Sequence, residues 1–149
     1  MTEKDYSGTP LPRKLGIKEG HAVLFVSAPP GLRELLEPMP PGVEVRERAR
    51  GQLDVVVLFA TKRSDLKRRF PALARAIAPS GGLWVAWPKK SSSIDNDLSF
   101  EAVQRIGLDT GLVDNKSAAI DADWQGLRFV VRVEDRPAWP IVLSRPTTA

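Results

Sequence analysis

The chain has 149 residues with 42% hydrophobic and 27% charged content, values close to those of ordinary globular domains, so neither a disordered nor a fibrous class is indicated. It contains no cysteine and a single histidine, His21, which excludes disulfides, thiolate metal sites and a cysteine nucleophile and disfavours a histidine-built metal centre. The formal net charge of +4 leaves weak attraction to anions open.

The first 20 residues are polar and rich in turn-forming residues, and they predict an arm that precedes the domain. A helical turn is expected at 12–15, with three apolar side chains holding the arm to the domain: Leu11, Leu15 and Ile17. The N-terminus has no apolar stretch of signal-peptide length, and the longest apolar run, 55–60, is far shorter than the roughly 20 residues of a membrane helix. We therefore expect a cytoplasmic protein without membrane insertion.

The next part of the chain predicts three strands and a short helix. The continuous apolar run at 23–28 is typical of a strand buried on both faces. A short helix is expected at 31–37, and residues 43–49 alternate apolar with charged side chains, as in an edge strand. Residues 53–61, LDVVVLFAT, form the most β-prone stretch and predict a central strand.

Helical spacing of apolar residues from 66 to 77 predicts a helix, with Ser64 as its N-cap. Pro71 lies inside this pattern and predicts a kink or the start of a second short helix. The sequence PSGG at 79–82 is expected to end the helix before a strand at 83–88.

The distal part of the chain predicts a helix and a hairpin. Ser99 is expected to cap a helix over 100–110 that ends at Gly111, with Leu98 and Val103 as a hydrophobic staple. Two β-rich runs, 112–120 and 127–134, are close enough to pair as an antiparallel hairpin.

The resulting element order, β-α-β-β-α-β-α-β-β, is typical of an α/β domain, an open three-layer sandwich whose sheet is mostly parallel with an antiparallel pair at the end. The predicted organisation is an arm at 1–20, a single α/β domain at 21–135 and a proline-rich tail at 136–149. Part of the tail is expected to dock on the domain or on a partner through Trp139, Ile141, Val142 and Leu143.

Two sets of motifs resemble known families. The stretches DVVVLFA, IAPSGGLWVAW, TGLVDNKSAAID and GLRFVVRV resemble the distal half of the Rossmann-like fold of S-adenosylmethionine-dependent methyltransferases, and LGIKEGHAVLFV resembles the lead-in to their first strand. This resemblance implies a reduced methyltransferase-like fold with a glycine-rich turn before one strand and a reversed hairpin at the sheet edge.

The motifs YSGTPLPRKLGI, WVAWPKK, GLVDNK and WQGLRFVVR resemble those of a bacterial family known only as a domain of unknown function, from Tyr6 to about Arg132. This resemblance implies the same fold without an assigned activity, and it implies regulation rather than catalysis for some members. Those members carry a cysteine in the region of Ala118, so this chain does not share a thiol-based mechanism.

Ligands of open parallel sheets bind outside the carboxyl ends of the strands, where the strand order reverses. If the strands at 23–28 and 53–61 flank that point, the loops after them and after 83–88 form a hydroxyl-rich, basic rim. Backbone N–H groups at helix starts and lysine charges would hold an anion there. The candidate ligand-binding residues of this rim are Ser27, Gly31, Thr61, Lys62, Arg63, Ser64, Trp87, Lys89 and Lys90.

The first loop of this rim departs from a phosphate-binding glycine loop. Only Gly31 is present, and Pro29 and Pro30 remove two N–H donors. Glu47 is the one candidate for the acidic residue that binds ribose hydroxyls in the methyltransferase pattern. The missing glycines and donors predict a degenerate cofactor loop. The alternative is that the turn only makes a rigid connection between the strand and the helix.

No catalytic residue and no metal site are predicted. Trp87 either stacks on a ligand ring or covers the strand end, with Lys89 and Lys90 either binding an anion or solvated. His21 precedes the first strand and is expected at the opposite edge, as a satisfied or surface histidine. Ser91–Ser93 lacks a histidine within reach, no G-x-S-x-G motif is present, and loop or cap roles are expected for most of Asp95, Asp97, Asp114, Asp121 and Asp123.

The leading functional hypothesis is a non-enzymatic regulatory module that binds a protein partner, tuned by a small anion at the rim. The alternative is a protein that binds S-adenosylmethionine or a nucleotide, including a methyltransferase-like enzyme. Nucleic-acid binding is disfavoured, because the basic runs at 13–18 and 62–69 are interrupted by apolar or acidic residues, as on solvated helix faces.

Overall fold

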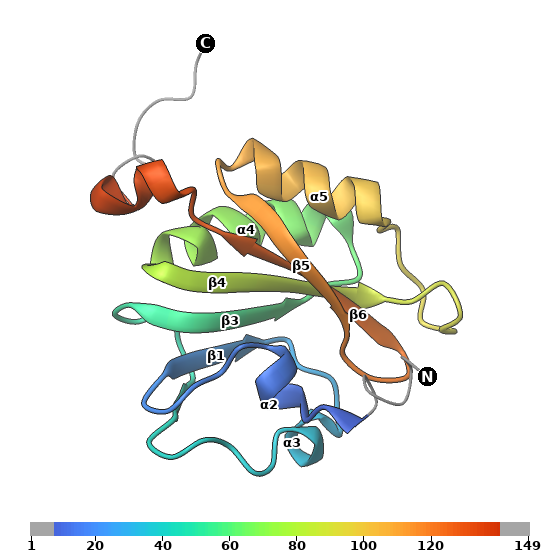
Figure 1. Cartoon of the computed structure of the whole chain (residues 1–149). Coiled ribbons are helices and arrows are strands. Elements are labelled where there is room, and N and C mark those ends of the chain that lie inside the picture. Colours follow the sequence, from blue (N-terminus) through green and yellow to red (C-terminus); the bar gives the residue numbers. More distant parts are fainter. Residues whose placement is uncertain (1–7, 141–149) are drawn as a thin grey trace.

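The computed structural model describes residues 8–140, and the docking predicted for Ile141, Val142 and Leu143 lies outside the described residues. A single six-stranded sheet with the order β2-β1-β3-β4-β6-β5 organises the fold (Figure 1). Its strands are β1 (Ala22–Val26), β2 (Glu44–Arg46), β3 (Leu53–Phe59), β4 (Ile77–Pro88), β5 (Val113–Ala119) and β6 (Trp124–Val130).

The first four strands of this order are parallel, and β6 is antiparallel to both of its neighbours. From β1 the chain moves outward to β2 and then returns to place β3 on the other side of β1. The predicted α/β architecture, a mostly parallel open sheet with a C-terminal antiparallel hairpin, is confirmed.

Helices cover both faces of the sheet. On one face α4 (Arg63–Ala76) and α5 (Phe100–Asp109) bury a core in which Phe70 and Phe129 meet edge to face, with ring centroids 5.3 Å apart (Figure 1). On the other face α2 (Leu11–Lys14) and α3 (Leu32–Leu35) pack over a second core around Trp84. The two cores and the sheet between them form the three predicted layers.

The N-terminal arm is part of this second core. The three predicted anchors, Leu11, Leu15 and Ile17, are buried. The fully buried Trp84 donates a hydrogen bond from Nε1 to the carbonyl of Leu15 at 3.0 Å. The arm therefore covers part of this face of the sheet.

The α4–β4 segment differs from prediction in three respects. The helix runs unbroken through Pro71, its N-cap is Lys62 rather than Ser64, and β4 starts directly after it at Ile77. Pro71 has no N–H group, so the carbonyl of Lys67, four residues earlier, loses its helical hydrogen bond. Lys67 is exposed, so water can replace the lost donor and the helix continues.

The glycines of PSGG lie inside β4 because neighbouring groups approach the backbone there. A Cβ atom at Gly81 would lie 2.9 Å from the carbonyl oxygens of Leu53 and Asp54, and one at Gly82 would lie 2.5 Å from Nε of Arg128. Glycine is therefore needed at these positions because neighbouring groups pack against the backbone, and not because a helix ends there.

The distal elements follow the predictions with shifted bounds. Ser99 Oγ accepts the N–H of Ala102 at 3.2 Å and caps α5, which ends before Gly111 at φ 103°. The hairpin forms, but β6 starts earlier than predicted because Asp121 Oδ1 accepts the N–H groups of Asp123 and Trp124 and tightens the turn. The last two residues of the predicted strand, Val133 and Glu134, begin the 3₁₀ helix η1 (Val133–Ala138) instead.

The chain after η1 returns to the core through Trp139. This side chain is 6% exposed, and its Nε1 donates to the carbonyl of Ala74 in the last turn of α4 at 3.2 Å. Trp139 therefore docks on the domain, as the sequence predicts.

Candidate functional site

The carboxyl ends of β1 and β3 meet where the strand order reverses, between the outward path to β2 and the return to β3. We refer to the loops at 27–31 and 60–62, with the end of β2, as the carboxyl edge. This edge is where open α/β sheets place their ligands.

The loop after β1 connects directly into α3. Ser27 is exposed and adopts a left-handed φ of 59°, and Gly31, at φ 88°, is the N-cap residue of α3 without a side-chain cap bond. Between them Pro29 accepts the N–H of Leu32 at 3.3 Å. Because α3 is only four residues long and two of the loop residues are prolines, few backbone donors are available for a phosphate group.

Asp97 occupies the start of α4. Its Oδ1 accepts the backbone N–H of Arg63 at 2.6 Å, its own N–H donates to the carbonyl of Thr61 at 3.1 Å, and its carbonyl accepts Nη2 of Arg63 at 3.3 Å. The Asp97 carboxylate therefore already occupies the position at the N-terminus of α4 where the predicted anion would accept hydrogen bonds. Thr61 is half-buried, whereas Lys62 and Ser64 are exposed.

We expect Asp97→Ala to lower the free energy of unfolding by about 1 kcal/mol, because the first N–H group of α4 loses its carboxylate acceptor. Urea unfolding measures the change. Asp95→Ala, which removes an exposed carboxylate of the same loop, is the matched control and should change stability by less. Equal effects of the two substitutions would show that the contact with Arg63 does not stabilise the helix.

The candidate residues at the carboxyl end of β4 separate into two groups. Trp87 is 3% exposed, and its ring lies 6.4 Å from that of Phe100 on the face covered by α5, so it is not presented for stacking on a ligand. Lys89 is half-buried and its N–H donates to the carbonyl of Asp123 at 2.8 Å, while Lys90 is exposed. Lys89 therefore lies beside the β5–β6 turn, and Lys90 follows it in the chain.

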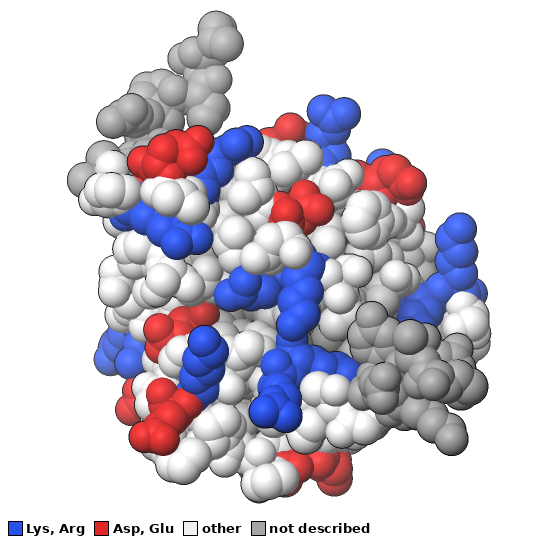
Figure 2. Space-filling view, in the orientation of Figure 1, with Lys and Arg blue, Asp and Glu red and all other residues white. Residues whose placement is uncertain are grey.

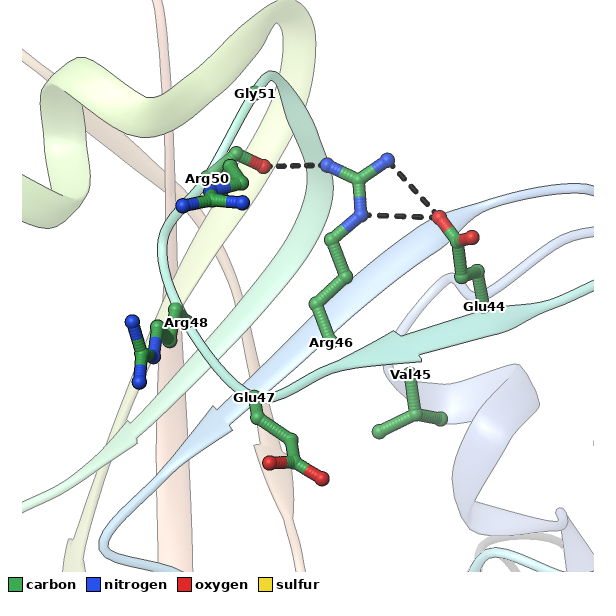
Figure 3. A pocket seen from close by; sticks show the side chains of 7 residues that line it. All are labelled: Glu44, Val45, Arg46, Glu47, Arg48, Arg50 and Gly51. Carbon is green, nitrogen blue, oxygen red and sulfur yellow. Dashed lines mark hydrogen bonds and ion pairs between the residues drawn. The ribbon is translucent and has the colours of Figure 1, made fainter.

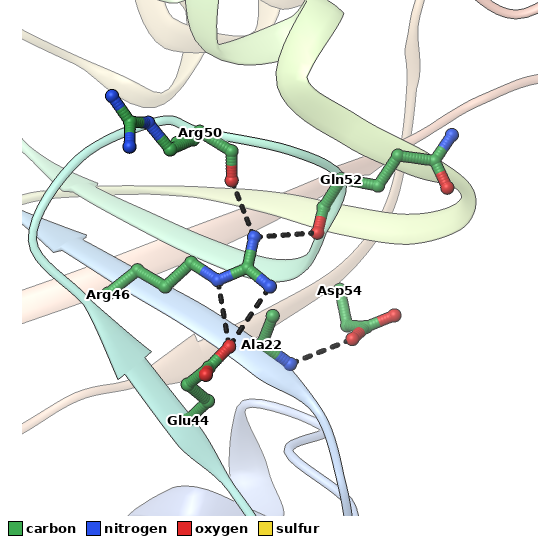
Figure 4. Close-up of polar contacts among 6 residues, drawn as sticks. All are labelled: Ala22, Glu44, Arg46, Arg50, Gln52 and Asp54. Atoms are coloured by element: carbon green, nitrogen blue, oxygen red, sulfur yellow. Dashed lines mark hydrogen bonds and ion pairs between the residues drawn. The ribbon is translucent and has the colours of Figure 1, made fainter.

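The end of β2 forms the wall of a shallow cavity of about 590 Å³ between residues 44 and 51. Arg46 folds back over it: Nε and Nη2 contact Glu44 Oε1 at 3.0 Å, and Nη1 donates to the carbonyls of Arg50 and Gln52 (Figure 4). Glu47, directly after β2, points away from this guanidinium, and no described residue pairs with it (Figure 3). Its carboxylate is therefore available at the end of the strand next to β1.

Several of the remaining polar candidates have structural partners. His21 lies at the amino end of β1, where Nδ1 accepts the N–H of Lys18 at 3.1 Å. Gln104 Nε2 donates to both oxygens of Asp114, and Asp121 shapes the hairpin turn. Within residues 8–140, no three or more acidic or histidine side chains are grouped to hold a metal ion.

Across that same part of the chain, no helix combines the length and hydrophobicity needed to cross a membrane.

The sheet order and the helices on both faces define a Rossmann-like, methyltransferase-like α/β fold. Among solved structures, the chain resembles a protein from Pyrococcus horikoshii OT3 with a TM-score of 0.56 and 12% identity, over 88% of this chain and 90% of that one. It also resembles the magnesium protoporphyrin IX methyltransferase of Synechocystis PCC 6803 with bound SAM, with a TM-score of 0.52 and 12% identity, over 76% and 71% of the two chains.

A third similar structure is the fibrillarin pre-rRNA processing protein of Methanococcus jannaschii, with a TM-score of 0.50 and 14% identity, over 83% of this chain and 69% of that one. At such identities the likeness establishes the fold alone. No protein-family model matches the sequence, and no curated protein matches it. Membership of the bacterial family of unknown function therefore stays a prediction.

Proposed function

We propose that this chain binds S-adenosylmethionine at the carboxyl edge. The observation that carries the proposal is the position of Glu47, an exposed carboxylate without a described partner directly after β2, beside the point where the strand order reverses. In dinucleotide-binding sheets, an acidic residue in the corresponding region accepts hydrogen bonds from ribose hydroxyls. Glu47 fits this role for the ribose of an adenosyl group.

The chemistry of the edge favours an adenosyl ligand without phosphates over a nucleotide. Pro29 and Pro30 remove donors from the loop after β1, and the Asp97 carboxylate occupies the start of α4, so both usual phosphate sites are weakened. S-adenosylmethionine carries no phosphate, and the Asp97 carboxylate attracts its positively charged groups. When bound, this cofactor supplies an electrophilic methyl group.

The residues that would hold the ligand come from three segments of the carboxyl edge. Glu47 would accept hydrogen bonds from the ribose, and the hydroxyls of Ser27 and Thr61 would contribute further polar contacts. The likeness to a methyltransferase solved with bound SAM supports the same choice of ligand. These observations favour the cofactor-binding hypothesis over the leading hypothesis from the sequence.

A protein-binding regulatory module remains the second candidate, and one observation favours it. The edge strand β2 leaves one side of its backbone unpaired, and Val45 on this strand is 54% exposed. Exposed strand edges and apolar side chains are where partner chains add to a sheet.

Thermal unfolding with a panel of ligands tests the proposed function. S-adenosylmethionine, S-adenosylhomocysteine and adenosine are expected to raise the melting temperature, since a ligand at 100 times its Kd adds about 2.7 kcal/mol to the stability of the folded state. ATP is expected to have a smaller effect because the edge lacks phosphate donors. If no adenosyl compound shifts the transition, the protein-binding module replaces the proposed function.

We expect Glu47→Gln to weaken the binding of S-adenosylmethionine about tenfold, because hydrogen bonds to a charged acceptor contribute about 1.5–3 kcal/mol and an amide is a weaker acceptor. Isothermal titration calorimetry measures the change in Kd. Glu101→Gln, an exposed substitution in the first turn of α5, is the matched control and should leave Kd unchanged. Equal affinity of Glu47→Gln and the unsubstituted protein would remove Glu47 from the site.

A further inference from the structure

A basic cavity of about 370 Å³ lies at the opposite edge of the sheet, between the N-terminal arm and the β5–β6 hairpin. We refer to it as the amino-edge pocket. Its lining includes four side-chain cations and one carboxylate, and Figure 2 shows Lys and Arg side chains gathered in the middle of the face that carries α2 and β5. The charged residues of the lining are Lys14, Lys18, Lys116, Arg128 and Asp54.

Arg128 is half-buried, whereas Lys18 and Lys116 of the same lining are exposed. Its Nε atom is buried and has no hydrogen-bond partner among residues 8–140. Burial lowers the pKa of this guanidinium below its ordinary value, and the like charge of Arg136 lowers it further. The side chain lies directly over Gly82, where a Cβ atom would come within 2.5 Å of Nε, so the glycine makes room for it.

Other positive charges surround Arg128 instead of compensating it. Lys116 pairs with Arg128 across the hairpin, and like charges at directly opposite positions destabilise a sheet. Lys116 Nζ donates to the carbonyl of Lys14 at 3.3 Å, and Lys14 Nζ donates to the carbonyl of Ala119 at 3.3 Å, which brings both ammonium groups to the seam between arm and hairpin.

The single carboxylate of the pocket is already engaged. Asp54 Oδ2 accepts the backbone N–H of Ala22 at 2.8 Å (Figure 4). No ion pair within the described part of the chain involves Arg128 or any of the three lysines. Folding therefore leaves an excess of positive charge around a half-buried arginine whose buried Nε donor is unused, an arrangement that costs stability unless an anion completes it.

We propose that the amino-edge pocket binds the phosphate group of a small metabolite, with the half-buried Arg128 as the anchor and Lys14 and Lys116 at the seam. A planar guanidinium matches phosphate oxygens through paired N–H donors, and the Ser80 hydroxyl on the lining adds a further donor. The cavity volume falls within the range of small-ligand sites, about 300–1,000 Å³. The pocket lies at the other end of the strands from Glu47, so this inference does not depend on the proposed function.

Calorimetric titration with inorganic phosphate tests the pocket, with chloride adjusted to hold the ionic strength constant. The unsubstituted protein is expected to bind phosphate, and Arg128→Met is expected to weaken that binding about tenfold, because a charge-assisted contact is lost. Lys67→Met, which removes an exposed lysine of α4, is the matched control and should leave the Kd for phosphate unchanged.

The melting temperature in phosphate-free buffer shows whether Arg128→Met loses phosphate binding only because it fails to fold. Arg128→Met keeps an unbranched side chain over Gly82 and removes the repulsion from Lys116 and Arg136, so it is expected to match or exceed the melting temperature of the unsubstituted protein. Phosphate should then raise the melting temperature of the unsubstituted protein only. A lower melting temperature for Arg128→Met with an unchanged phosphate affinity would assign Arg128 a purely structural role and overturn the proposal.

The phosphate group could belong to a small metabolite or to the backbone of a nucleic acid. Titration with a short single-stranded oligonucleotide distinguishes these two sources. Free phosphate that binds in an Arg128-dependent manner, with no tighter binding of the oligonucleotide, supports a small-metabolite site. Oligonucleotide binding that depends on Arg128 without detectable binding of free phosphate would overturn it, and so would the absence of any phosphate binding by the unsubstituted protein. A negative result with S-adenosylmethionine would leave each of these outcomes unchanged.

Discussion

Gly107→Ala is expected to lower the free energy of unfolding by about 1–3 kcal/mol, although alanine is the better helix former by about 1 kcal/mol. Gly107 is buried in α5, where the helix meets β6. A Cβ atom there would overlap with three ring carbons of Phe129. Phe129 is itself fully buried and meets Phe70 edge to face, so neither the ring nor the helix can shift without opening the core.

Urea unfolding of two further variants separates steric overlap from helix propensity. Ala102→Gly, in the same helix, is expected to lower stability by about 0.5–1 kcal/mol through propensity alone. Combining Gly107→Ala with Phe129→Leu should cost less than the sum of the two single substitutions, because the smaller side chain relieves the overlap. Strictly additive effects would show that the alanine methyl group does not press on Phe129.

Trp84→Ala is expected to lower the free energy of unfolding by about 3–5 kcal/mol, the range of large aromatic truncations in cores. Trp84 is fully buried in the middle of β4 and packs over Gly126, whose absent Cβ leaves space for the indole. The substitution also removes the hydrogen bond from Nε1 to the carbonyl of Leu15. Trp84→Ala therefore has two effects: it opens a cavity in the core, and it removes a hydrogen bond that holds the N-terminal arm.

Trp84→Phe isolates the second effect, because it keeps an aromatic ring and removes the N–H donor. We expect a smaller loss of about 1–3 kcal/mol from the unsatisfied carbonyl, together with faster tryptic cleavage after Arg13 and Lys14 as the arm loosens. Trp139→Phe, which removes the indole donor to Ala74 instead, is the matched control and should leave cleavage in the arm unchanged. Unaltered cleavage in Trp84→Phe would mean that the hydrogen bond does not hold the arm.

The architecture was predictable because the strands that define it carry strong local signals. The continuous apolar stretches of β1 and β3 identify parallel strands buried on both faces, and the Ser99 cap and Gly111 fix both ends of α5. Local signals failed where tertiary contacts decide the structure. The glycines of β4 resemble a helix stop in sequence, but they serve close approach by Arg128 and by the backbone of β3.

The candidate site shows the same division. Topology alone predicts the reversal of strand order beside Ser27 and Gly31, because it follows from the order of elements. The contact between Asp97 and Arg63 joins residues 34 positions apart, and no spacing in the sequence signals it. The pairing of Lys116 with Arg128 depends on the register of the hairpin, which the sequence left unassigned, so the amino-edge pocket emerges only from the structure.

The most direct test of the account is an amide NMR titration of isotope-labelled protein with S-adenosylmethionine. The proposed function predicts that saturating ligand shifts the amide signals of residues 27, 28, 31, 32, 47 and 61–64, while the signals around Arg128 stay in place. Saturating S-adenosylmethionine that leaves the signals of the carboxyl edge unmoved would contradict it.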